Sequence, residues 1–66
     1  MRIDRVAFAA NMARKDINLK TLAYRTGLSR STVTAVKSGK TCSDETGRKI
    51  AAALEVDVEQ LIAKEG

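Results

Sequence analysis

The 66-residue chain contains no histidine, proline or tryptophan, and only one cysteine, one tyrosine and one phenylalanine. The lone Cys42 cannot form an internal disulfide, and without histidine the chain lacks a set of nitrogen and sulfur ligands for zinc. No apolar run approaches the roughly 20 residues that span a bilayer, and residues 1–5 lack the apolar segment of a signal peptide. We therefore expect a cytoplasmic protein that needs no metal, cofactor or membrane.

The same absences argue against an enzyme. General acid–base catalysis most often uses histidine, and the single thiol has no imidazole partner to activate it. No carboxylates cluster on one helical face. A chain of this length forms one small domain, residues 1–66, near the lower size limit for a core that has no disulfide or metal. These features favour a binding function.

What is present is a sequence for an all-helical domain, because apolar residues recur at helical spacing and few β-branched residues alternate as strands require. The pattern predicts helices over residues 3–15, 18–26, 29–38 and 43–54, and a fifth helix that begins at Asp57. Asn18, Ser29 and Ser43 are favourable residues for the starts of the three central helices. Asp57 and Gln60 resemble a capping box at the fifth.

The sequence leaves the packing open in two places, the first helix and Gly47. In the first helix, one apolar stripe contains Ile3, Val6, Ala7, Ala10 and Ala13. Phe8 and Met12 lie beside that stripe, and periodicity alone does not decide which set faces the core, although we expect Phe8 and Met12 to be largely buried. Gly47 interrupts the fourth helix at a cost of about 1 kcal/mol relative to alanine. This indicates either close packing against another backbone segment, which we favour, or simple tolerance of the glycine.

The stretch from Asn18 to Lys40 indicates two short helices around a tight turn. Gly27 ends the first helix, Leu28 returns to the core and Ser29 caps the second helix. Val33 and Val36 mark the buried side of that second helix. The residues left on its outer side are polar or small: Arg30, Ser31, Thr34, Ala35 and Ser38.

The net charge of +4 is unevenly distributed. Residues 14–40 hold seven Lys or Arg and one acid, whereas residues 41–66 hold three Lys or Arg and six acids. A basic block that coincides with the two-helix unit suits a polyanion, since neutralised phosphates release counterions from nucleic acid. Charge alone is equally consistent with a solvated basic surface.

The order of these elements resembles the Cro/C1-type (Xre) helix-turn-helix family. The matching positions are Leu22-Ala23, Gly27-Leu28-Ser29, Val33, Val36, Gly39-Lys40, Thr46, Ile50-Ala51, Ala53-Leu54 and residues 58–62. The resemblance implies a compact, five-helix, lambda-repressor-like DNA-binding domain with the helix-turn-helix at helices two and three. It also implies a regulator of transcription, most simply a repressor, that binds a double-stranded DNA operator as a dimer. We expect a weak homodimer with helix five as the contact.

The resemblance also assigns roles to individual residues. Residues 29–38 match the helix that enters the major groove, where Arg30, Ser31 and Thr34 take base-contacting positions. Arg30 can bind guanine O6 and N7 or instead hold a phosphate, and the sequence leaves both open. Ser29 is better explained as a cap. Five positions match phosphate contacts: Asn18, Lys20, Ser38, Lys40 and Thr41.

Four residues depart from the family pattern. Leu19 stands where a polar residue, often Gln, is common, and Cys42 where Pro is frequent; Asn11 and Gly47 replace apolar residues. The alternative function is a protein-interaction module, antitoxin-like or holding another regulator, which would use the acidic surface of helices four and five. Residues 58–62 would supply its apolar contacts, although burial in the core also explains them.

Overall fold

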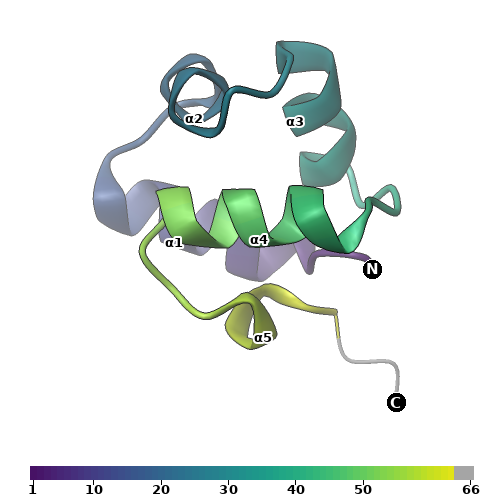
Figure 1. Cartoon of the computed structure of the whole chain (residues 1–66). Coiled ribbons are helices and arrows are strands. Elements are labelled where there is room, and N and C mark those ends of the chain that lie inside the picture. Colours follow the sequence, from purple (N-terminus) through teal and green to yellow (C-terminus); the bar gives the residue numbers. More distant parts are fainter. Residues whose placement is uncertain (64–66) are drawn as a thin grey trace.

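The computed structural model describes residues 1–63, which fold into five helices (Figure 1). The helices are α1 (Arg5–Lys15), α2 (Leu19–Thr26), α3 (Arg30–Lys37), α4 (Asp44–Ala53) and α5 (Val58–Leu61). The prediction of an all-α domain with the helix-turn-helix at α2 and α3 is confirmed.

The helices close around a shared apolar core. α2 packs on α3 and α4, α1 packs on α3 and α5, and α4 packs on α5. Phe8 in α1 is fully buried, and so are side chains from each of the other elements: Ile3, Leu22, Val33, Val36, Ile50, Leu54 and Leu61. Because α2 and α3 supply three of these side chains, their relative orientation is fixed by the core.

Side-chain caps begin the three central helices as predicted. The cap bonds are Thr21 N–H to Asn18 Oδ1 (2.8 Å), Thr32 N–H to Ser29 Oγ (3.1 Å) and Thr46 N–H to Ser43 Oγ (3.1 Å). The predicted capping box at α5 is wrong, because Asp57 makes no side-chain cap bond. The Gln60 N–H instead donates to the Asp57 carbonyl oxygen at 3.0 Å.

The predicted start of the first helix is also wrong. α1 begins at Arg5, where the Asp4 carboxylate accepts the Ala7 N–H at 2.9 Å. Ile3 is extended, pairs with Ile62 in an antiparallel bridge and is buried. Val6, from the same expected stripe, is 76% exposed. The long-range pairing removes Ile3 from the helix and changes which face of α1 meets the core.

On the core face of α1, the expectation for Phe8 and Met12 is confirmed, since both are buried. Asn11, the departure from the family pattern on this helix, is buried as well. Its Nδ2 donates to the Ala7 carbonyl oxygen at 2.8 Å, so the buried amide is hydrogen-bonded within α1. The polar residue is therefore accommodated in the core by a hydrogen bond within its own helix.

The first four residues form an extended segment that joins two distant loops. Arg2 pairs with Thr41, and the Ala63 N–H donates to the Arg2 carbonyl oxygen at 2.9 Å. The Cys42 N–H donates to the Met1 carbonyl oxygen at 2.7 Å, and the Met1 amino group donates to the Cys42 carbonyl oxygen at 2.7 Å. This segment therefore holds the loop after α3 against the chain that follows α5.

Gly47 is closely packed, but not against a backbone segment as predicted. A Cβ atom at Gly47 would collide with the sulfur of Met1, so a side chain fills the space beside this glycine. The missing Cβ gives the extended segment room to cross α4. Close packing at Gly47 is thus a consequence of the N-terminal pairing.

Candidate nucleic-acid interface

The turn between α2 and α3 is fixed by hydrogen bonds at each step. Gly27 has a left-handed φ of 73°, and its N–H donates to the Ala23 carbonyl oxygen at 3.0 Å. The Thr26 hydroxyl donates to the Leu22 carbonyl oxygen at 2.8 Å and accepts the Leu28 N–H at 3.3 Å. α3 therefore leaves this turn in a defined direction.

α3 buries one side and presents the other to solvent. Val33 and Val36 are buried, whereas Arg30, Ser31 and Thr34 are exposed, as their spacing predicted. Among residues 1–63, these three exposed side chains take part in no hydrogen bond or ion pair. Their donors and acceptors remain available to a ligand that approaches the outer side of α3.

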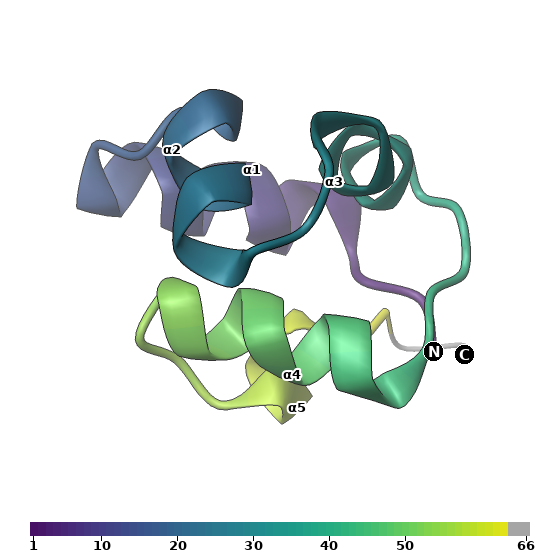
Figure 2. The same ribbon diagram turned by 45° about the horizontal axis from the view of Figure 1, so that its top comes forward.

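The five predicted phosphate contacts fall into two groups at the ends of the helix-turn-helix (Figure 2). Asn18 and Lys20 lie at the start of α2, and both are exposed. Ser38, Lys40 and Thr41 follow α3 and are also exposed. The structure brings the second group next to the extended N-terminal segment, because the backbone of Thr41 pairs with that of Arg2.

Two of these side chains already make local bonds. Asn18 Oδ1 is occupied by the cap of α2, which leaves the amide NH₂ group for a phosphate. The Ser38 hydroxyl donates to the Ala35 carbonyl oxygen at 2.8 Å and would have to rotate to donate elsewhere. Lys20 and Lys40 carry no ion pair within the described chain.

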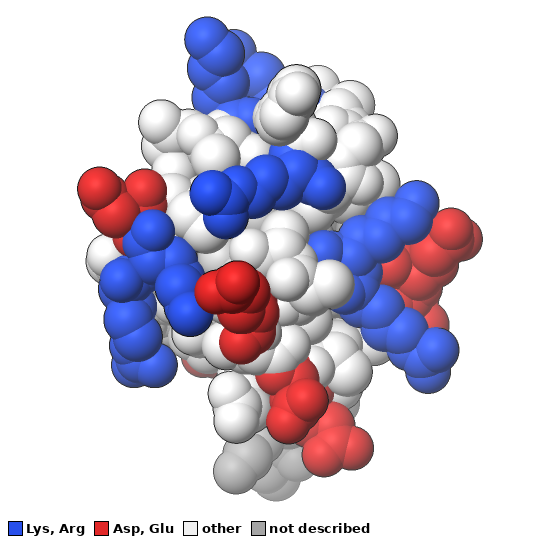
Figure 3. All heavy atoms as spheres, turned by 60° about the vertical axis from the view of Figure 1, so that its left-hand side comes forward, with Lys and Arg blue, Asp and Glu red and all other residues white. Residues whose placement is uncertain are grey.

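The charge separation seen in the sequence persists in three dimensions. In Figure 3, Lys and Arg gather over the upper part, where α2 lies, and acidic side chains over the lower part, where α5 lies, while both signs are interspersed at mid-height. The ion pairs among residues 1–63, Lys15–Glu55 at 3.1 Å and Lys49–Glu45 at 3.4 Å, leave all the predicted DNA contacts unpaired. The basic charge on the helix-turn-helix is therefore not neutralised internally.

Cys42, in the loop after α3, adds no negative charge to this surface at neutral pH. Burial raises the pKa of its thiol above the usual 9.0, the Met1 ammonium opposes that rise and Asp44 adds to it. The neutral thiol packs against the core, in a position where the family often has proline. It therefore does not repel an approaching phosphate.

The structure adds two basic residues to this region that the sequence did not indicate. Arg2 lies in the extended N-terminal segment and Arg5 is the first residue of α1, and both line a cavity beside the end of α3. No periodic pattern in the sequence links residues 2–5 to residues 38–41, because the bridge between Arg2 and Thr41 is long-range and isolated. The basic charge of Arg2 and Arg5 was the only sequence feature that could have indicated them.

Comparison with known proteins identifies the class. A family model for the Cro/C1-type helix-turn-helix DNA-binding domain matches residues 10–65. The chain belongs to this family. No curated protein matches the sequence.

Three solved structures share the fold over all of this chain at 24% identity. A point variant of hydroxyethylphosphonate dioxygenase superposes with a TM-score of 0.86, and native PhpD with cadmium atoms with a TM-score of 0.84. PhpD with cadmium and a bound phosphonate gives 0.83. The chain spans 14% of the length of each, so these similarities establish the fold alone.

Within residues 1–63, no helix is long and apolar enough to cross a membrane. Nor does this part of the chain bring together three or more His, Cys, Asp or Glu residues in a position to hold a metal ion.

Proposed function

We propose that this domain is a sequence-specific regulator of transcription, most simply a repressor, that places α3 in the major groove of double-stranded DNA. The observation that carries the proposal is the outer side of α3, where Arg30, Ser31 and Thr34 are exposed and unpaired on a helix fixed by the turn before it. An α-helix fits the major groove, and the first residues of such a helix lie nearest the base edges.

The three side chains have complementary chemistry for base edges. The Arg30 guanidinium can donate two hydrogen bonds to guanine O6 and N7, which contributes about 1–3 kcal/mol of discrimination against another base. The hydroxyls of Ser31 and Thr34 donate or accept. The methyl groups of Thr34 and Ala35 can contact the methyl group of thymine.

Asn18, Lys20, Ser38, Lys40 and Thr41 would hold the backbone on either side of the groove and set the register of α3. Leu19 is half-buried and packs against the core, so the start of α2 lacks the polar side chain that is common in the family. We infer that affinity depends more on the group that follows α3. Repression would then follow if the bound domain covers a promoter.

A homodimer would let two copies of α3 read half-sites about one helical turn apart. α5 is the proposed contact. Leu61 of α5 is buried in the core, while Val58 and Ile62 are half-buried, so the exposed part of such a contact would be partly polar. Sedimentation that shows only monomer at high concentration, with and without operator DNA, would remove the dimer from the proposal.

The burial of Leu61 also bears on the alternative of a protein-interaction module. The apolar residues of α5 pack against the core, and folding alone accounts for them. Folding does not account in the same way for the exposed side chains of Arg30, Ser31 and Thr34 on α3. A regulator that binds operator DNA would act in the cytoplasm, the location expected from the sequence.

The test is selection of binding sites from a random duplex library, followed by fluorescence anisotropy with the enriched duplex. Arg30→Gln should relax the preference at one base position by about 1–3 kcal/mol. Lys49→Gln removes the same charge from the outer side of α4 and should leave the preference unchanged. Failure to enrich any sequence, or binding that is indifferent to salt, would refute the proposal.

A further inference from the structure

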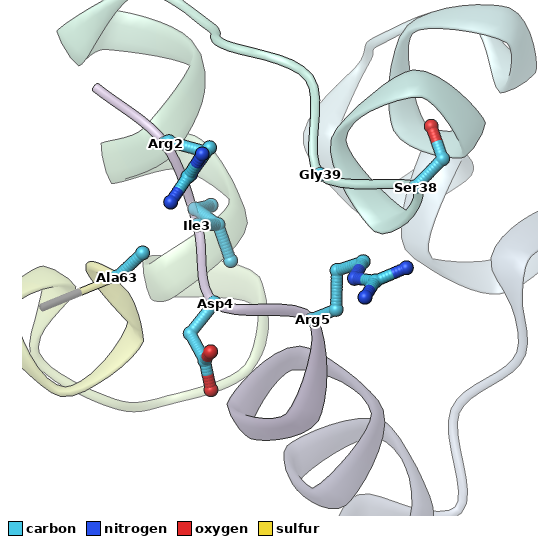
Figure 4. A pocket seen from close by; sticks show the side chains of 7 residues that line it. All are labelled: Arg2, Ile3, Asp4, Arg5, Ser38, Gly39 and Ala63. Carbon is cyan, nitrogen blue, oxygen red and sulfur yellow. The ribbon is translucent and has the colours of Figure 1, made fainter. Parts of the chain in front are cut away.

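A polar cavity of about 350 Å³ lies beside the end of α3 (Figure 4). Residues 2–4 of the extended N-terminal segment and Arg5 at the start of α1 form one side of the cavity, Ser38 and Gly39 form another, and Ala63 completes it. The cavity therefore adjoins the loop that contains Lys40 and Thr41.

Two positive charges line this cavity without a partner. Arg2 and Arg5 are exposed, and neither forms an ion pair or a side-chain hydrogen bond within residues 1–63. The one carboxylate at the cavity, that of Asp4, accepts the Ala7 N–H at the start of α1. Figure 4 shows it turned away from both guanidinium groups, so it does not neutralise them.

The backbone fixes the position of each arginine. Arg2 pairs with Thr41 in an antiparallel bridge, which places the two side chains on the same side of the paired segments. Gly39 has a φ of 96°, and a Cβ atom there would lie 3.2 Å from Cδ of Arg5. The stem of Arg5 thus lies along the end of α3, where a larger residue than glycine would crowd it.

We propose that Arg2 and Arg5 each bind a backbone phosphate of the DNA, next to the phosphate contacts expected at residues 38–41. A guanidinium group suits this ligand because its donors form a planar fork that matches phosphate oxygens. The cavity would extend the footprint past the end of α3. It would also offset the missing polar contact at Leu19, on the opposite end of the helix-turn-helix.

This inference rests on the proposed function, and it is tested by the salt dependence of binding to the selected duplex. Each phosphate contact contributes about 0.9 to the slope of log K against log salt. Arg2→Gln and Arg5→Gln should each make the slope shallower by about 0.9, and the double variant by about 1.8. Glutamine retains part of the Arg5 stem, and circular dichroism would verify that each variant is folded. Base preference should stay unchanged, because phosphate contacts carry no direct sequence information.

A duplex series in which single phosphates are replaced by neutral methylphosphonates locates the contacts. Two neighbouring flanking positions, one for each arginine, should weaken binding of the unmodified protein and have no further effect on the double variant, since both changes remove the same interactions. Lys49→Gln serves as the matched control and should retain the full slope. If the arginine variants keep the slope of the unmodified protein, the inference is overturned while the proposed function stands. If no duplex is enriched at all, the proposed function and the inference fail together.

Discussion

At the scale of single residues, two glycines in the left-handed conformation flank α3. Gly27 precedes α3 with a φ of 73°, and Gly39 follows it with a φ of 96°. Residues that carry a Cβ atom are strained in this left-handed region, whereas glycine is not. Gly27 thus turns the chain toward the Ser29 cap that begins α3, and Gly39 turns it away after α3 ends.

Gly27→Ala should destabilise the domain by about 1–2 kcal/mol through backbone strain alone, because no atom lies within 4 Å of the added Cβ. Gly27→Asn should cost less, since asparagine tolerates the left-handed region better. Urea unfolding monitored by circular dichroism measures both changes. An alanine variant as stable as the original protein would show that the turn does not require this conformation.

Cys42 gives stability a dependence on pH. Burial raises the pKa of the folded thiol above 9.0, its usual value, so the unfolded chain loses the thiol proton first. The contribution is fully present below pH 9.0 and is lost as pH rises through the folded pKa. Above pH 9.0, the original protein should therefore lose stability faster than Cys42→Ser. Parallel stability curves for the two proteins between pH 7 and 10.5 would contradict this account.

At the scale of elements, the packing of α1 and of the segment before it determines which apolar residues enter the core. Ile3 is 1% exposed although it lies outside the helix, whereas Val6 is 76% exposed although it lies within it. Ile3→Ala should cost about 2–5 kcal/mol, the range for truncation of a buried aliphatic side chain. Val6→Ala should change stability by less than about 0.5 kcal/mol. Equal losses in urea unfolding would mean that the packing of α1 described above is incorrect.

The elements that could be predicted from sequence are those that local chemistry determines. Asn18, Ser29 and Ser43 each bond to an N–H three residues along the chain, so their sequence position is enough to predict the cap. The exposed side of α3 followed from the spacing of Val33 and Val36 for the same reason. Both predictions use interactions within a single turn of helix.

The extended N-terminal segment was missed because its interactions are not local. Ile3 pairs with a residue 59 positions away, and a bridge of one residue pair has no periodicity to detect. The helical spacing of Ile3 and Val6 then favoured a longer helix. Arg2 and Arg5 were missed as parts of the candidate site for the same reason, since only the folded chain brings them beside Ser38 and Gly39.

At the scale of the whole molecule, basic charge gathers on the helix-turn-helix and acidic charge around α5. Glu55, Asp57 and Glu59 are exposed there, on the side that the proposal keeps away from phosphates. Acidic side chains that faced the DNA would repel its phosphates and weaken association. This arrangement therefore favours one orientation of approach. The whole-molecule charge distribution and the exposed side of α3 thus support the same binding face.

Binding of the selected duplex should stabilise the folded domain as a whole. At a duplex concentration 100 times the dissociation constant, the gain is about 2.7 kcal/mol. A thermal melt with and without the duplex would detect it. Arg30→Gln at the same duplex concentration should gain less, because its affinity is lower. A melting temperature that does not respond to the duplex would indicate that the folded domain does not bind it.

The most direct test of the central claim is a map of amide chemical-shift changes as the selected duplex is titrated into the ¹⁵N-labelled domain. We predict the largest changes along residues 29–38, with smaller ones at residues 18–20 and 40–41, and little change in α4 and α5. Changes confined to α4 and α5, with α3 unaffected, would contradict the claim that the outer side of α3 binds DNA.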